Sequence, residues 1–223
     1  NGSNLDTNAG NRVLSTNNLS MTLVYVDGTQ GWKSVEEGTG YIGEVFMVAT
    51  GGTITESGDD KIHKFTGPGT FTVCSVAACA ANNLVSYVVV AGGASGGSGN
   101  NNNNGGGGGG AGGFRETKSP ATPYTASPLD GYATPGNRIT VTAADFPITV
   151  GGGGSASSPL NPGSAGSTST FSTITSHGGG GGGANAVGLA GGSGGGGSCS
   201  SNPGGAGNAP PVTPAQGLGG GDS

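Results

Sequence analysis

The chain has 223 residues, of which 53 are Gly and 12 are Pro, while charged residues make up only 9%. Gly and Pro together exceed twice their usual share, and the charged share is about a third of the usual one. The formal net charge is −5, and the seven Lys and Arg residues are scattered, which excludes the basic patch of a nucleic-acid-binding protein. Disordered chains are usually rich in charge, so this composition favours an ordered chain.

Neither end of the sequence carries a recognisable targeting segment. The chain starts at Asn1 with no initiator Met or signal segment, and it stops within the glycine run GLGGGDS. We therefore expect both ends to be cuts in a longer polypeptide. The longest strongly apolar run is YVVVA, residues 87–91, which is far shorter than a membrane span, so we expect no membrane insertion.

Residues 1–50 have a roughly normal composition and are expected to form a β-rich fibre or attachment segment. The β-prone run 21–26 is followed by the pair Asp27-Gly28 and then by a segment that contains Trp32 and Val35. Asp-Gly between two such runs is a strong hairpin signal. A further strand is expected within residues 41–52.

Residues 51–91 are expected to form a region of short β-hairpins. Its β-prone pieces are residues 53–55, 61–66, 70–73 and 85–91, and turn residues separate them. The tripeptide Gly67-Pro68-Gly69 predicts a hairpin between the second and third pieces, because Pro fixes φ and Gly allows positive φ.

Residues 92–223 contain repeated glycine runs, and several of them directly follow a β-prone segment. The sequences SYVVVAGG, FPITVGGGG and FSTITSHGGGGGG all show this arrangement. The spacing is unequal, so no strict-period solenoid is predicted. A flexible linker would not need a strand at each entrance, and we therefore expect ordered glycine segments separated by polar loops.

A glycine segment can form an extended helix with three residues per turn and about 3.1 Å rise per residue, without internal hydrogen bonds. Its N–H and C=O groups must then pair with neighbouring segments. The predicted fold is mainly β with irregular structure: short strands and hairpins lead into a bundle of polyglycine II helices, with little or no α-helix. Collagen is excluded because there is no Gly-X-Y period, and no series of calcium-binding glycine repeats occurs.

Candidate chemical groups are few and dispersed. His63 and His177 lie in different zones, where a strand-surface role and a packing or capping role are expected, and the adjacent pairs Glu36-Glu37 and Asp59-Asp60 point to opposite strand faces. No phosphate-binding G-K-[ST] follows any glycine run. Cys74, Cys79 and Cys199 allow idle or buried thiols, a disulfide between Cys74 and Cys79, or a metal ligand. We expect no enzyme activity, no cofactor and no metal.

The order of motifs VYVDGTQGWK, GGTITESGDDKIHKFTGPGTFTV, SYVVVAGG, GAGGFRE, FPITVGGGG, FSTITSHGGGGGG and PPVTPAQGLGGG resembles the glycine-rich domain of bacteriophage tail and tail-fibre proteins, notably of marine phages. The chain is also similar to polyglycine-sandwich adhesins at tail-fibre tips. The resemblance covers nearly all of residues 21–221. The sequence departs from it in the asparagine-rich insert SGGSGNNNNNGG.

The resemblance implies a virion component that is assembled in the host cytoplasm, acts outside the cell, and is often a homotrimer. Such a protein contacts other virion proteins and binds a host surface protein or glycan through loops. The expected contacts are Arg115, Tyr124, Tyr132, Arg138 and the asparagine run. The alternatives are a phage head fibre or capsid decoration, or an ice-binding or cell-wall glycine-rich protein.

Overall fold

The computed structural model describes residues 21–27, 31–37, 46–58, 60–99, 105–199 and 201–223. The chain divides into two compact units, Asn1–Val45 and Phe46–Ser223. In the first unit, β1 (Met21–Asp27) pairs antiparallel with β2 (Gly31–Glu37). The strands of the hairpin predicted around Asp27-Gly28 are therefore confirmed, while residues 28–30 lie outside the described part of the chain.

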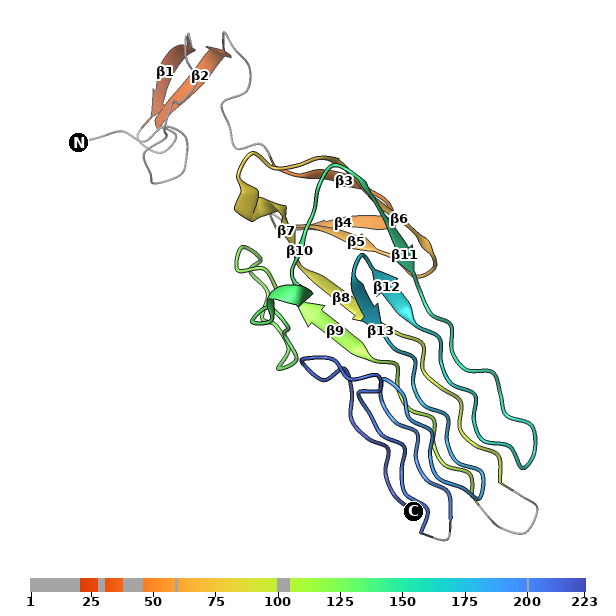
Figure 1. The fold of residues 1–223 in the computed structure, drawn as a ribbon. Coiled ribbons are helices and arrows are strands. Elements are labelled where there is room, and N and C mark those ends of the chain that lie inside the picture. The colour runs from red at the N-terminus through yellow and green to blue at the C-terminus, as the bar shows by residue number, and fades with distance from the viewer. Residues whose placement is uncertain (1–20, 28–30, 38–45, 59, 100–104, 200) are drawn as a thin grey trace. The chain divides into compact units, whose positions relative to one another are not determined.

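Short strands make up the regular structure of the second unit (Figure 1). They are β3 (Val48–Thr50), β4 (Thr53–Ser57), β5 (Asp60–Lys64), β6 (Gly69–Ser75), β7 (Leu84–Val85), β8 (Tyr87–Val90), β9 (Phe114–Thr117), β10 (Ile139–Thr140), β11 (Asp145–Thr149), β12 (Ser169–Phe171) and β13 (Ile174–Ser176). Two 3-10 turns, η1 (Ala80–Asn83) and η2 (Pro135–Asn137), are the helical elements of the described residues. The predicted fold class, mainly β with little helix, is confirmed.

The strands of the second unit form one larger sheet and several pairs. The larger sheet has the order β13-β12-β11-β6-β3, and all its neighbours are antiparallel. The pairs are β8 with β9, β7 with β10, and β4 with β5. Strands adjacent in the sequence, such as β11 and β12, are thus also adjacent in space, although a glycine-rich excursion separates them.

An aromatic cluster forms the core between these sheets. The ring of Phe171 lies 6.0 Å from that of Phe71 and 5.9 Å from that of Tyr87, both edge to face, which is a favoured aromatic geometry. Val73 and Val141 are each only 2% exposed. This core fixes the ends of the strands from which the glycine segments leave.

The hairpin predicted at Gly67-Pro68-Gly69 is wrong. β5 pairs with β4 through a turn at Gly58, where φ is +60°, and β6 pairs with β3 and β11 instead. Gly69, the last residue of this tripeptide, packs against an aromatic side chain, because a Cβ on it would lie 3.2 Å from the Phe65 ring. The chain therefore passes from one sheet to another at this tripeptide. The turn residues alone do not determine which strands β6 pairs with.

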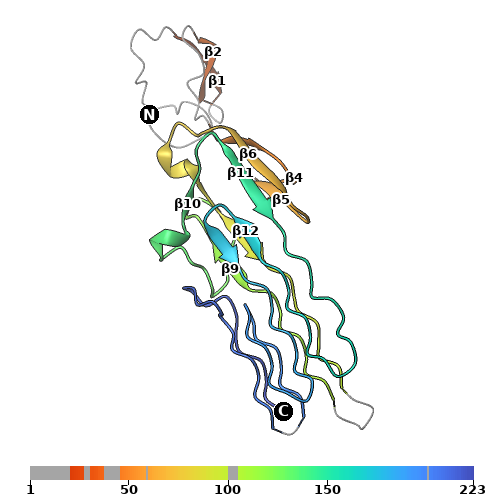
Figure 2. The same ribbon diagram turned by 45° about the vertical axis from the view of Figure 1, so that its right-hand side comes forward.

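Extended segments run from the strands and return beside one another (Figures 1 and 2). We call these segments rods and letter them in chain order: A (91–98), B (105–113), C (151–154), D (161–167), E (177–183), F (186–191), G (192–198), H (202–208) and I (216–223). Rod A continues β8, rod B leads into β9, rod C follows β11, and rod E follows β13. The expected entry of strands into glycine segments is thus observed.

Hydrogen bonds between the rods repeat every three residues. In rod A, the N–H groups of Ala91, Ala94 and Gly97 donate to carbonyls of rod B at 2.9–3.0 Å. The N–H groups one residue further on, at Gly92, Ser95 and Ser98, donate to rod D at 2.9–3.1 Å. A period of three with lateral pairing is the pattern of polyglycine II.

The hydrogen-bond partners arrange the rods in layers: C–A–B, then D–E–G–I, then F–H. Rod E lies at the centre, donating to rods A and G and accepting from rods B, D and F. Its residues 179–183 are all buried. These glycines bury no side chain, so lateral hydrogen bonds and the anchoring β core hold the central rod in place.

Steric contact, and not backbone conformation, explains most rod glycines. Positive φ occurs among the described glycines at Gly51, Gly52 and Gly58, none of which lies in a rod. A Cβ on Gly180, by contrast, would collide with the Leu189 carbonyl, and one on Gly182 with the Gly107 carbonyl. Glycine is therefore needed because neighbouring backbones lie too close for even a methyl group.

Candidate functional site

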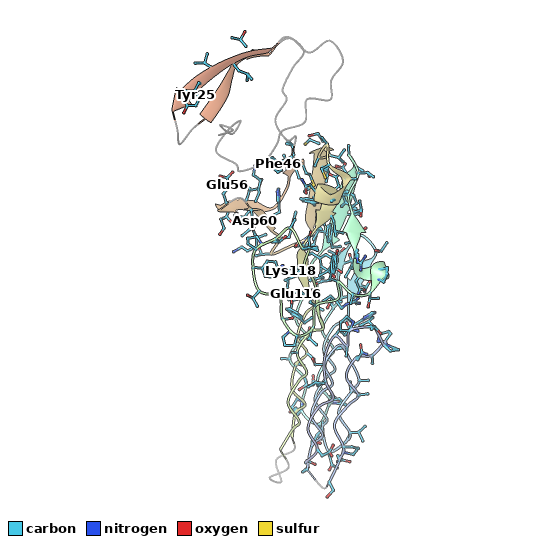
Figure 3. All side chains as sticks on the ribbon, turned by 90° about the vertical axis from the view of Figure 1, so that its left-hand side faces the viewer. Tyr25, Phe46, Glu56, Asp60, Glu116 and Lys118 are labelled. Carbon is cyan, nitrogen blue, oxygen red and sulfur yellow. The ribbon has the colours of Figure 1, made fainter. Side chains whose placement is uncertain are left out.

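Two groups of loops emerge from this scaffold, one beside the strands and one at the far ends of the rods. The first is the segment 118–138, which follows β9 and contains most of the residues predicted to contact a receptor. Glu116 and Lys118, at its start, lie where the rods leave the strands (Figure 3).

Arg115 is not a loop residue, so that part of the prediction is wrong. It lies in β9 and is only 7% exposed. Its Nη2 donates to Asn137 Oδ1 at 2.6 Å, and its Nη1 lies 3.5 Å from the Thr175 carbonyl oxygen. A buried guanidinium requires such partners, and here it ties the loop to the β core in place of facing a ligand.

Asn137 joins the segment 118–138 to several other parts of the chain. Its Oδ1 accepts from Arg115, and its Nδ2 donates to the Thr213 carbonyl at 2.8 Å. The backbone carbonyl of Asn137 accepts from the Tyr87 hydroxyl at 2.7 Å. Burial raises the pKa of Tyr87, although the Thr117 hydrogen bond acts in the opposite direction. Local sequence patterns do not indicate this buried network, because its members are far apart in the chain.

Tyr124 is 38% exposed and has a carboxylate neighbour. Burial of its hydroxyl raises its pKa to about 12, and the charge of Glu116, a hydrogen bond to Glu116 and the charge of Asp130 act in the same direction. Lys118 Nζ lies 5.8 Å from the Tyr124 ring centroid, within the range of a cation–π contact. The partly exposed Tyr124 ring thus lies beside a cation.

Tyr132 and Arg138 form a stacked pair on the same segment. Arg138 Cζ lies 4.4 Å from the Tyr132 ring centroid, and its Nε donates to the Tyr132 carbonyl at 2.7 Å. Asp130 Oδ1 accepts from the N–H groups of Lys118 and Tyr132, both at 3.0 Å. Tyr132 is half-buried and Arg138 is exposed, so the structure brings three of the predicted residues to one loop segment.

The second group consists of the turns at the ends of the rods away from the strands (Figure 1). Residues 155–160 join rods C and D, residues 184–185 join rods E and F, and Cys199 and Ser201 lie between rods G and H. Leu160 is 62% exposed with φ at +69°, and Val187 is 48% exposed. The asparagine run, residues 100–104, lies outside the described part of the chain.

Polar contacts hold the turn 155–160 against the end of rod A and join rods A and D beside it. Ser157 Oγ donates to the Gly96 carbonyl at 3.0 Å, and the N–H of Ser98 donates to the Asn161 carbonyl at 3.1 Å. The turns contain Ser, Asn, Ala, Pro, Leu and Cys, with no Lys, Arg or Glu. Sequence reasoning singled out only the asparagine run, although each return between two glycine runs marks such a turn.

The two histidines have structural partners, and the three cysteines are unpaired with one another. His63 Nδ1 lies 2.8 Å from the Gly51 carbonyl, and its ring packs edge-on against Phe71. His177 pairs with Gln216, which is 1% exposed and also donates to the Pro210 carbonyl at 2.9 Å. Cys74, Cys79 and Cys199 are free thiols. Among the described residues, no cluster of His, Cys, Asp and Glu could hold a metal ion, and no helix is long and apolar enough to cross a membrane.

The fold and its loops define a β-sheet protein that carries a hydrogen-bonded bundle of polyglycine II rods. Residues 65–223, well over half of the chain, match the glycine-rich domain family. The chain therefore belongs to that family. Neither the curated proteins nor the solved structures included in the comparison matched it.

Proposed function

We propose that the protein is a structural component of a bacteriophage virion, in the tail fibre or tail tip, and that it binds a host-cell receptor through its loops. The observation that carries the proposal is the lateral hydrogen bonding of the rods. Rod E forms hydrogen bonds with five other rods, A, B, D, F and G. The rods therefore act as one scaffold that holds their loops in place. The order of strand, glycine segment and loop motifs, which resembles that of phage tail proteins, supports the same function.

A rigid scaffold favours tight binding because its loops are ordered before they meet a ligand. Ordering a loop or a flexible side chain on binding costs free energy, and preorganisation removes that cost. The turns at the rod ends are held by backbone hydrogen bonds, such as that from Ser198 N–H to the Ala186 carbonyl at 3.2 Å. The scaffold contributes geometry, and the loop side chains contribute specificity.

The loop segment 118–138 supplies the side chains best suited to contact a receptor. Tyr and Arg are enriched among the residues that dominate binding energy at interfaces. Tyr124 presents a ring beside Lys118, and Tyr132 stacks with Arg138. Such rings bind the apolar face of a sugar or a protein side chain. Arg115 is left out of this proposed contact because its guanidinium is buried.

The proposal is tested by adsorption. The purified full chain, labelled with a fluorophore, should bind host cells and compete with virions for adsorption. The double variant Tyr124→Ala/Tyr132→Ala should compete at least about tenfold less well, which corresponds to about 1.4 kcal/mol. Ile54→Ala, a change to an exposed apolar residue of β4 outside both groups of loops, serves as the control.

Four results would count against the proposal or a part of it. A full chain that fails to bind host cells would remove the receptor function, and unchanged competition by the double variant would move the contact away from the segment 118–138. Gold-labelled antibodies against the chain locate it on virions. Label on the capsid would assign it to a head fibre or decoration, and an unlabelled virion would contradict the virion location altogether.

A further inference from the structure

One face of the rod bundle consists mainly of glycine backbone, although the exposed Ala111 of rod B adds a methyl group. The layer C–A–B packs on rods D, E and G with one face, and no rod covers the other. We call this uncovered surface the outer glycine face. It is formed by Gly93 and Gly96 of rod A, Gly109 and Gly112 of rod B, and Gly153 of rod C. All of these are exposed except Gly112, which is half-buried.

Backbone hydrogen-bonding groups on the outer glycine face lack partners. In rod A, two of the three series of N–H groups donate to rods B and D, whereas Gly93 and Gly96 donate to no described residue. With three residues per turn, successive N–H groups point about 120° apart, so the third series points away from the bundle. The carbonyl of Gly109 likewise accepts no hydrogen bond from the described residues.

Packing within one copy does not explain every glycine of this layer. A Cβ on Gly93 would approach no atom closer than 3.7 Å, one on Gly153 none closer than 3.6 Å, and one on Gly152 would meet nothing within 4 Å. Their φ angles are not positive. Alanine would therefore fit, and it would lower the conformational entropy that the chain loses on folding. Neither steric contact nor backbone conformation within one copy explains why these positions are glycine.

The opposite layer, F–H, behaves differently. Its rods expose Val187 (48%), Leu189 (39%), Ala190 and Ala206. Outward positions of a rod thus accept side chains in this bundle. The scarcity of side chains on the outer glycine face is a property of that face and not of rods in general.

We propose that the outer glycine face binds the same face of a second copy of this chain. Inside the bundle, glycine allows two backbones to approach closely enough for N–H···O=C bonds, as rods A and E show with the bond from Gly179 to Gly92 at 3.0 Å. The outer glycine face offers unpaired donors and acceptors with the same three-residue period. Residues 92–113 and 150–154 contain no charged side chain, so two copies would not repel each other.

The contact is isologous, since the same patch is used on both copies, and it closes as a dimer. It differs from the three-fold assembly that the phage resemblance implies. It also does not depend on receptor binding, because Tyr124 and Tyr132 lie on the segment 118–138, outside this layer.

Sedimentation equilibrium of the full chain tests the proposal. The native chain should form a dimer at micromolar concentration. The variant Gly93→Gln/Gly153→Gln places two long side chains on the outer glycine face, at positions where an added Cβ meets no atom closer than 3.6 Å, and should weaken dimerisation more than about tenfold. The matched control Ala190→Gln/Ala206→Gln adds the same side chains to the opposite layer and should leave the dimer intact.

A second measurement does not depend on any variant. Hydrogen exchange of the Gly93 and Gly96 amides should slow as the native chain is concentrated, because a second copy would then accept their hydrogen bonds. Four results would overturn the proposal: a monomeric native chain, a dimer or trimer that persists in Gly93→Gln/Gly153→Gln, equal loss of dimer in the control, and amide exchange that is independent of concentration. Circular dichroism confirms that each variant is folded.

Discussion

Two glycines of the same hexaglycine run, 105–110, should respond in opposite ways to alanine. A Cβ on Gly110 would collide with the carbonyl oxygens of Ser193 and Gly194 in rod G, whereas a Cβ on Gly108 would meet nothing within 4 Å. Both residues have φ outside the positive region. The two substitutions are chemically identical and lie two positions apart, so each serves as the control for the other.

The magnitude for Gly110→Ala follows from its contacts. Overpacking against a backbone that is itself held costs about 1–3 kcal/mol. Gly110 also donates to the Gly180 carbonyl at 2.8 Å and accepts from Ala94 at 2.9 Å, and weakening these bonds costs up to about 0.5–1.5 kcal/mol each. The lower entropy of the unfolded alanine chain returns about 0.4–1 kcal/mol. The net loss of unfolding free energy is therefore about 2–4 kcal/mol.

Gly108→Ala gains only the entropic effect and should stabilise the protein by about 0.4–1 kcal/mol. Urea unfolding followed by circular dichroism measures both values, and the midpoint should fall for Gly110→Ala and rise slightly for Gly108→Ala at an unchanged slope. Equal effects of the two substitutions would refute the steric explanation of the rods. So would a strongly destabilised Gly108→Ala.

Three further predictions concern the polar network and the loop segment. Gln216→Ala should lower the unfolding free energy by about 2–4 kcal/mol in urea unfolding, because it removes a buried side chain and leaves the partly buried Pro210 carbonyl and His177 N–H without partners; a loss below about 0.5 kcal/mol would contradict this. Arg115→Ala should remove about 1–3 kcal/mol by the same assay, since it leaves the buried Asn137 Oδ1 without its Arg115 partner, yet it should leave receptor binding unchanged in any protein that remains folded. Absorbance at 295 nm should show Tyr124 ionising near pH 12. Because the pKa of Tyr124 in the folded chain lies above the unfolded value of 10.0, its contribution to stability is complete below pH 10 and is lost as the pH rises toward 12. Ionisation of Tyr124 near pH 10 would contradict the proposed environment.

Local sequence patterns predicted the elements but not all of their partners. The β-prone pieces at residues 53–55 and 70–73 became β4 and β6, and the strand-to-glycine transitions after β8, β11 and β13 are present. The Gly67-Pro68-Gly69 hairpin was wrong because β6 pairs with β3 and β11. Pairing between distant strands depends on which apolar faces meet in the core, and turn residues carry no information about that.

The predicted receptor contacts show the same limit. Tyr132 and Arg138 were chosen as side chains of a polar loop, and they stack on the segment 118–138. Arg115 directly follows a glycine run and Phe114, and nothing in that local sequence distinguishes a buried strand residue from an exposed loop residue. Its burial depends on Asn137, which only the folded chain brings within reach.

The sequence by itself determined that the rods would be extended and laterally bonded, because a glycine run has only backbone groups with which to interact. The tertiary structure alone decided which glycines are indispensable. Gly108 and Gly110 cannot be distinguished in the sequence of the glycine run. In the structure, Gly108 faces open space and Gly110 faces the carbonyls of rod G. The physical reason is that a three-residue turn gives each glycine a fixed direction, and only the positions of neighbouring rods determine what lies in that direction.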